Sequence, residues 1–242
     1  MDWFKDDDFW RELFPLMFPA ERFEAAPQQV EQLLKLTDVK SGAVLDSCCG
    51  PGRHAHQLAL RGFQVTGVDH SPFLLEKARS SFTEHPIEWV QQDMCEFRRP
   101  GAFDLACNLF TSFGYFDSEQ KNLQVLRNVH ESLKPGGVFV LDVFGKEYLA
   151  RVWKGAICTD YPDGLTLLQR PKVVDDWCKV ENEWVVMKDG AYRTYRFKHW
   201  IYSGRELKER LQAAGFAKVD LFGDLAGSPY GMDATRLVAV AR

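Results

Sequence analysis

Three aspartates in the first hundred residues stand at the ends of short apolar segments, where their carboxylates could meet one ligand. Asp46 ends AVLD, Asp69 ends QVTGVD, and Asp93 follows IEWVQQ. In a sheet of parallel strands, ligands bind beyond the carboxyl ends of the strands. Three carboxylates gathered there would repel a phosphate and favour a ligand with hydrogen-bond donors or a positive charge.

The loop that follows Asp46 has the composition of a backbone surface that lies against a ligand. It reads SCCGPG, and its glycines, Gly50 and Gly52, permit positive φ and leave no Cβ in the way. A helix predicted to begin near Gly52 would point its free N–H groups into the same crevice. The glycines also match a relaxed dinucleotide fingerprint, so the loop alone does not select the ligand.

The residues at the other strand ends suggest which ligand that is. Asp69 has the position of an acid that accepts the hydroxyls of a ribose. Asp93 can accept the exocyclic amine of an adenine while Met94 covers the ring. Further polar residues at the same strand ends are His70, Gln92 and Asn108. This set describes a nucleoside with a cationic appendage and no phosphate, and S-adenosylmethionine fits that description.

The elements that would position these residues alternate between strand and helix. Strands are predicted at 43–46, 64–69, 87–90, 103–108 and 138–144, with helices after the first, second and fourth of them. This rhythm is typical of an α/β fold with a doubly wound, mostly parallel sheet. Lys134-Pro135-Gly136-Gly137 is predicted to close the third of these helices.

The segments on either side of this rhythm differ from it. Residues 1–40 are predicted to be a helical N-terminal cap, and residues 145–202 an inserted antiparallel β subdomain that serves as a substrate lid. The insertion shows two-residue periodicity and a KDG turn at 188–190. Residues 203–242 return to the S-adenosylmethionine-binding α/β domain of 41–144, starting with a capping box at Ser203.

Composition excludes several function classes. The 242 residues carry a formal net charge of −4, which does not suit a general nucleic-acid binder. No apolar run approaches the roughly 20 residues that a membrane span needs. The start MDWFKDDDFW is neither a signal nor a transit peptide, so we expect a cytoplasmic protein. Its six cysteines lack a C-x-x-C spacing and are expected to be reduced; no metal site is expected.

In order and spacing, the segments VLDSCCGPGRHA, VTGVDHSP, QQDM, FDLACNLFTSFGYF and LKPGGVFVLD resemble the motifs of class I S-adenosylmethionine-dependent methyltransferases. The resemblance implies a seven-stranded Rossmann-like sheet and a product, S-adenosylhomocysteine. It implies that Asp46 and the backbone of 48–52 hold the methionine part, and that Asn108 offers its carbonyl to the cofactor amine. The family commonly has glycine where Cys48 or Cys49 stands, so we expect these cysteines to be compact packing residues rather than a redox or metal pair.

The resemblance also implies methyl transfer to N or O of a small-molecule acceptor. The sequence after the fourth strand, NLFT, lacks the Asn/Asp-Pro-Pro-aromatic motif of enzymes that methylate DNA bases. The predicted catalytic residues are Tyr115, His199 and Tyr202, with Phe113, Arg53 and His54 as further candidates. We expect a monomer or homodimer with no nucleic-acid or membrane partner. Two alternatives stay open: a nicotinamide-dependent oxidoreductase and a non-catalytic S-adenosylmethionine-binding regulator.

Overall fold

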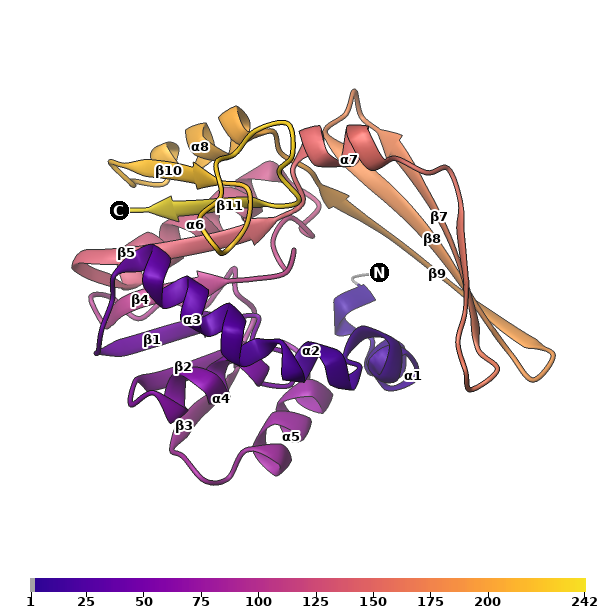
Figure 1. Ribbon diagram of the computed structural model, residues 1–242, viewed down its shortest axis with the longest axis horizontal. Helices are drawn as coiled ribbons and strands as arrows, with labels where there is room; N and C mark the ends of the chain where they lie inside the picture. The colour runs from indigo at the N-terminus through magenta and orange to yellow at the C-terminus, as the bar shows by residue number, and fades with distance from the viewer. Residues whose placement is uncertain (1–2) are drawn as a thin grey trace.

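The computed structural model describes residues 3–242 and contains two separate sheets within that range (Figure 1). The larger sheet has seven strands in the order β10-β11-β5-β4-β1-β2-β3. Its strands are β1 (Ala43–Ser47), β2 (Gln64–Asp69), β3 (Ile87–Gln91), β4 (Phe103–Asn108), β5 (Leu133–Val143), β10 (Val219–Phe222) and β11 (Leu237–Ala241). Strands β1 to β5 are parallel, whereas β11 runs antiparallel to both β5 and β10.

Helices cover both faces of this sheet because its central strands are apolar on both sides. In β5, Phe139 and Leu141 pack on one face, while Val138 and Val140 pack on the other. The first face is covered by α6 (Glu119–Ser132) and α8 (Gly204–Ala213). The second is covered by α3 (Ala26–Thr37) and α4 (Arg53–Leu60), and α5 (Pro72–Ser81) packs beside β2 and β3. The doubly wound, mostly parallel sheet predicted from the sequence is confirmed.

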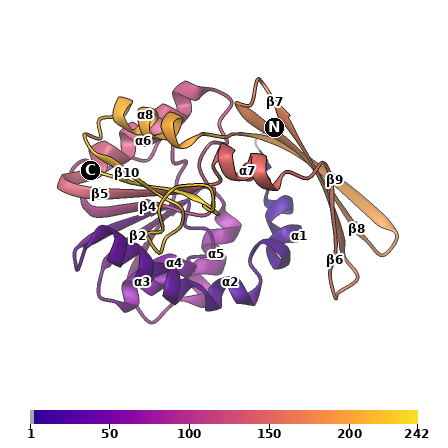
Figure 2. The ribbon, with the colours of Figure 1, turned by 45° about the horizontal axis from the view of Figure 1, so that its top comes forward.

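The second sheet is an antiparallel insertion that extends away from the first (Figures 1 and 2). It consists of β6 (Ile157–Asp160), β7 (Thr166–Val174), β8 (Lys179–Lys188) and β9 (Ala191–Trp200), and α7 (Lys146–Val152) leads into it. The turn between β8 and β9 falls at Asp189-Gly190, as the KDG segment predicts.

The N-terminal segment lies between the two sheets (Figure 2). It comprises the 3₁₀ turn η1 (Trp3–Lys5), α1 (Asp7–Met17) and α2 (Ala20–Glu24). Phe9 and Leu13 of α1 are fully buried against Leu167, Val186 and Tyr195 of the inserted sheet. Helix α1 therefore closes the space between the insertion and the α/β domain.

The boundaries of some elements differ from the sequence-based prediction, and one helix start agrees with it. Lys134-Pro135-Gly136-Gly137 does not close a helix, because α6 ends at Ser132 and β5 already begins at Leu133, with a register shift opposite Phe103 and Leu105. The short elements α7 and β6 were not predicted. The capping box at Ser203 is confirmed, since its hydroxyl accepts from the Glu206 amide and the Glu206 carboxylate accepts from the Ser203 amide. No helix in residues 3–242 is long and apolar enough to cross a membrane.

Candidate active site

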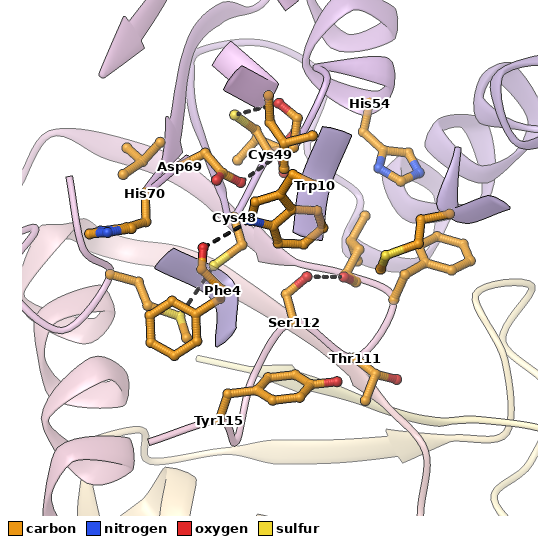
Figure 3. A pocket seen from close by; sticks show the side chains of 18 of the residues that line it. Phe4, Trp10, Cys48, Cys49, His54, Asp69, His70, Thr111, Ser112 and Tyr115 are labelled. Carbon is orange, nitrogen blue, oxygen red and sulfur yellow. Dashed lines mark hydrogen bonds between the residues drawn. The ribbon is translucent and has the colours of Figure 1, made fainter. Parts of the chain in front are cut away.

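A cavity opens at the carboxyl ends of β1, β2, β3 and β4, and the acids that the sequence singled out line it (Figure 3). The strand ends and the loop after β1 contribute Asp46, Cys48, Cys49, Gly50, Asp69, His70, Gln92, Asp93 and Met94. The loop after β4 contributes Leu109, Phe110, Thr111, Ser112, Tyr115 and Phe116, and the N-terminal segment contributes Trp3, Phe4, Trp10, Met17, Phe18 and Arg22. Nine of the eleven predicted cofactor residues therefore share one cavity; Gly52 and Asn108 are not in its lining.

Asp46 is the least solvated acid of the cavity. Its side chain is 2% exposed, and its Oδ2 has no hydrogen-bond partner among the described residues. Its Oδ1 lies 3.6 Å from the thiol of Cys107. Burial raises the pKa of Asp46 to about 7, against smaller lowering effects from Cys107 and Arg53. A buried carboxylate with a free oxygen is a binding position for a cation or a hydrogen-bond donor.

The loop after β1 is held in its unusual conformation by the neighbouring strand. Cys48 has a φ of 60°, in the left-handed region that favours glycine. The Cys49 amide donates to the Val68 carbonyl over 3.0 Å, and the Gly50 amide donates to Asp69 Oδ2 over 2.8 Å. Gly52 has a packing reason for lacking a side chain, because a Cβ there would lie 2.5 Å from the Trp89 ring.

The two adjacent thiols lie in tight, buried surroundings close to the carboxylates of Asp46 and Asp69. Cys48 Sγ lies 3.3 Å from the sulfur of Met94, and a Cβ on Gly67 would lie 3.1 Å from Cys49 Sγ. Burial raises the pKa of both thiols well above the usual value, so they are protonated at neutral pH. Both cysteines are unpaired. These contacts fit compact packing residues.

The acids at the ends of β2 and β3 each hold nearby backbone while lining the cavity. Asp69 accepts from the amides of Gly50 and Ser71, over 2.8 Å and 3.0 Å, and burial raises its pKa. Asp93 Oδ1 accepts from the Cys95 amide over 2.9 Å. Asn108, at the end of β4, is 1% exposed, and its Oδ1 has no partner in the described part of the chain. Asn108 itself is not in the cavity lining, but the next residue, Leu109, is.

Comparison with known proteins agrees with this geometry. A family model described as "Methyltransferase domain" matches residues 44–137, which span the loop, the strand-end acids and Asn108. A putative methyltransferase from Geobacillus sp. is 28% identical over 206 residues, covering 82% of this chain and 83% of the relative. The chain is a class I S-adenosylmethionine-dependent methyltransferase.

Other similar proteins can be aligned with most of the length of this methyltransferase. A glycine/sarcosine N-methyltransferase from Halorhodospira halochloris is 26% identical over 209 residues, covering 84% of this chain and 76% of the relative. An S-adenosylmethionine-dependent methyltransferase from Clostridium acetobutylicum has a TM-score of 0.77 at 16% identity, with 98% of each chain covered. The sugar N-methyltransferase KedS8 from Streptoalloteichus sp. has a TM-score of 0.68 at 21% identity, covering 96% of this chain and 91% of KedS8.

The cavity fits the cofactor of this enzyme class. The unpartnered oxygen of Asp46 suits the positively charged end of S-adenosylmethionine. Gly50 and Phe18 both line the cavity, and a Cβ on Gly50 would lie 3.5 Å from ring atoms of Phe18. The nicotinamide-dependent oxidoreductase considered from the sequence is not supported by the family to which the methyltransferase belongs.

The three predicted catalytic residues are not brought together in the methyltransferase cavity. Tyr115 lines it (Figure 3), and burial raises the pKa of its hydroxyl to about 12. His199 lies outside the lining, 5.2 Å from Tyr115 between ring centroids, and burial lowers its pKa to about 4. Tyr202 also lies outside the lining; it is buried, with its ring centroid 5.8 Å from that of Phe113. His199 and Tyr202 therefore do not reach the cavity.

Of the further catalytic candidates, two line the cavity and one does not. Arg53 and His54 line the cavity, and both bond to Gln29 Oε1 of α3, over 2.7 Å and 2.8 Å. Phe113 is buried and outside the lining. Burial lowers the pKa of His54 well below its usual value.

The sequence predicted a helical N-terminal cap over residues 1–40 but did not identify the residues that roof the cavity. Trp3, Phe4 and Trp10 come from the first ten residues, and the Trp10 indole donates to the Phe4 carbonyl over 2.9 Å. The aromatic character of MDWFKDDDFW was the available signal. Asp142 and Arg236, which hold the loop after β4, were also missed as a pair, because they are 94 residues apart.

Proposed function

We propose that this methyltransferase transfers a methyl group to an amine nitrogen of a small molecule and releases S-adenosylhomocysteine. The observation that carries the proposal is a cavity shared by three strand-end acids and an aromatic roof from the N-terminal segment. Such a roof leaves room for a small acceptor rather than a polymer. The names of the glycine/sarcosine and sugar N-methyltransferases among the similar proteins support an acceptor of this size.

In this proposal the strand-end residues divide the cofactor between them. Asp46 accepts from the ammonium of the methionine part, with its free Oδ2 as the acceptor. Asp69 keeps its two backbone bonds and uses its remaining lone pairs for the ribose hydroxyls. Asp93 and Met94 frame the adenine, with Gln92 and His70 beside them. Asn108 uses its backbone carbonyl near the methionine part.

The chemistry asks the protein mainly for alignment and exclusion of water. S-adenosylmethionine, when bound, supplies an activated methyl group on a sulfonium. Holding the acceptor in line with that group can contribute about 7–11 kcal/mol. Trp3, Phe4 and Tyr115 enclose the acceptor side, and their ring faces can stabilise the positive charge that develops on the nitrogen as the methyl group is transferred.

The pKa values of the candidate bases favour a nitrogen atom over an oxygen atom as the methyl acceptor. The Tyr115 hydroxyl keeps its proton up to about pH 12, and His199 has a pKa of about 4 and lies outside the cavity. Neither is a base matched to neutral pH. An amine also carries a proton near neutral pH, but with a pKa of about 8 it can lose that proton to water before it attacks with its lone pair. An aliphatic hydroxyl is not ionised at that pH and would need a base in the cavity. The lack of such a base at Tyr115 and His199 favours N-methylation over O-methylation.

The proposal includes the location of the enzyme, its oligomeric state and its partners. We expect the enzyme to act in the cytoplasm, as a monomer or homodimer, on a dissolved acceptor. The formal net charge of −4 argues against a nucleic-acid partner.

The experiment is an acceptor panel with a direct readout of cofactor turnover. The chain is incubated with S-adenosylmethionine and matched pairs of small molecules that differ only in carrying an amine or a hydroxyl, including glycine and aminosugar nucleotides. Mass spectrometry then measures S-adenosylhomocysteine and the methylated product. Turnover confined to the amine members supports the proposal. Turnover of the hydroxyl members alone, or calorimetric cofactor binding with no turnover across the panel, contradicts it.

A further inference from the structure

The loop after β4 contains two consecutive residues in a backbone conformation that side chains disfavour. Phe110 has a φ of 58° and Thr111 a φ of 63°. Neither residue is glycine, so the left-handed region costs free energy at both positions. Both residues line the cavity (Figure 3), where Thr111 and Tyr115 lie on the side away from Asp69. Such a conformation persists only where surrounding groups hold it.

Asp142 of β5 supplies the bonds that hold this backbone. Its Oδ2 accepts from the Phe110 amide over 2.9 Å, and its main-chain carbonyl accepts from the Thr111 amide over 2.9 Å. Asp142 is 1% exposed and is not in the cavity lining. One residue therefore satisfies both amides of the strained pair from outside the cavity.

Arg236, just before β11, completes the arrangement from the next strand of the sheet. Its Nε donates to Asp142 Oδ1 over 2.6 Å, and its Nη2 donates to Thr111 Oγ1 over 2.9 Å. The two carboxylate oxygens of Asp142 thus have different partners, one in the loop and one in Arg236. Because β5 lies between β4 and β11 in the sheet, the fold places Asp142 between the loop and Arg236.

The ring of Phe110 contacts two guanidinium groups and one imidazole ring. The guanidinium of Arg236 lies 5.5 Å from its centroid, and that of Arg53 lies 4.3 Å from it. The His54 ring is nearly parallel to it, at 5.4 Å and 12°. Arg236 itself packs over Phe144 at 4.1 Å. The contacts connect the loop after β4 to α4 on one side and to β5 and β11 on the other.

We propose that Asp142 and Arg236 are positioning residues that hold Phe110 and Thr111 in the conformation that shapes the acceptor side of the cavity. The assignment of this wall to the acceptor rests on the proposed function. The predicted cofactor acids come from β1, β2 and β3 instead, and only Asn108 among the cofactor positions adjoins this loop, inside β4. We therefore expect the pair to act mainly on the acceptor wall.

The first test measures amide hydrogen exchange by NMR in the full chain, without ligand. In Arg236→Gln and Asp142→Asn, exchange at Phe110 and Thr111 is expected to speed up at least tenfold, while amides inside β5 and β11 change less than threefold. Arg236→Lys keeps the positive charge but cannot bond to Asp142 and Thr111 at once as the guanidinium does. It should therefore fold and show an intermediate increase in the exchange rate at Thr111. Arg242→Gln is the matched control, since its ion pair with Asp220 lies in the same β10–β11 region.

The second test separates the cofactor from the acceptor. Calorimetry with S-adenosylhomocysteine should give affinities within threefold of wild type for Arg236→Lys and Arg236→Gln. With the amine from the panel that turns over best, the same variants should raise the acceptor KM or lower kcat at least tenfold, with the cofactor KM unchanged.

Two results would overturn the inference. One is unchanged exchange at Phe110 and Thr111 in a folded Arg236→Gln or Arg236→Lys chain. The other is exchange that rises equally along β5 and β11, which would assign the pair to strand pairing alone. The exchange and calorimetry readouts need no acceptor, so they stand even if the panel contradicts N-methylation.

Discussion

At the residue scale, Asp46 shows how one buried group links folding to cofactor binding. Its pKa of about 7 in the folded chain lies above the ordinary value of 3.8. The folded chain therefore holds this proton more tightly than the unfolded chain does. The resulting stabilisation is complete below about pH 4 and is lost as the pH rises to about 7. The ionised form, destabilised by burial, is the form that a cationic ligand would stabilise.

This linkage predicts the pH dependence of cofactor binding. The affinity for S-adenosylhomocysteine should rise by up to tenfold per pH unit from pH 5 to about 7 and then level off, because Asp46 must lose its proton to accept from the ammonium. Asp46→Asn should bind at least tenfold more weakly at pH 8 and lose most of the pH dependence. Calorimetry at four pH values measures both, with Asp220→Asn, at a half-buried position outside the cavity lining, as control. An Asp46→Asn profile as steep as that of wild type would point to another group, such as Asp69, whose pKa burial also raises.

Cys48 gives a second residue-scale prediction, because it occupies a left-handed position with a side chain. Cys48→Gly should be as stable as wild type or more so, by up to about 1 kcal/mol, since glycine adopts a φ of 60° without strain. Its affinity for S-adenosylhomocysteine should stay within a few-fold. Cys48→Val, which is β-branched, should destabilise the chain. Urea denaturation and calorimetry test these outcomes, and loss of binding in Cys48→Gly would instead indicate a role specific to the thiol.

At the scale of elements, the sequence predicted what depends on local periodicity and missed what depends on distant contacts. Strands β1, β2 and β4, which carry Asp46, Asp69 and Asn108 at or next to their ends, were predictable because each is a short apolar run between turn signals. The burial of Tyr202 beside Phe113 was not predictable, because it depends on how the chain returns from β9 to α8. The acids of the cavity follow from strand order, whereas its aromatic roof depends on where α1 packs.

The packing of α1 on the inserted sheet predicts that the two elements are stable only together. Phe9 is 0% exposed, and its ring lies 4.9 Å from that of Tyr195 and 4.7 Å from that of Trp3. Phe9→Ala should cost about 3–5 kcal/mol and weaken cofactor binding, because the roof residues lose their support. Tyr192→Ala, at a position 76% exposed on β9 of the same sheet, is the control and should change little. Equal stability of the two variants in urea denaturation would show that α1 does not depend on this contact.

At the scale of the whole molecule, the cavity joins three parts of the chain that are far apart in the sequence. The α/β domain supplies the floor, the N-terminal segment supplies the roof, and the inserted sheet supports that roof from behind (Figure 2). A ligand in the cavity must contact the first two parts at once. Its binding energy therefore adds to the contacts that hold the N-terminal segment in place.

This arrangement predicts that S-adenosylhomocysteine stabilises the N-terminal segment as well as the strand ends. At a concentration of 100 Kd the ligand should stabilise the folded chain by about 2.7 kcal/mol, seen as a higher Tm. Amide exchange in α1 should slow along with exchange in the loop after β1, because Trp3, Phe4 and Trp10 face the same ligand as Gly50. Adenosine, which lacks the methionine part, should protect the loop after β1 less. Protection confined to residues 46–94, with α1 exchanging as fast as in the free chain, would mean that the aromatic roof does not close on the cofactor.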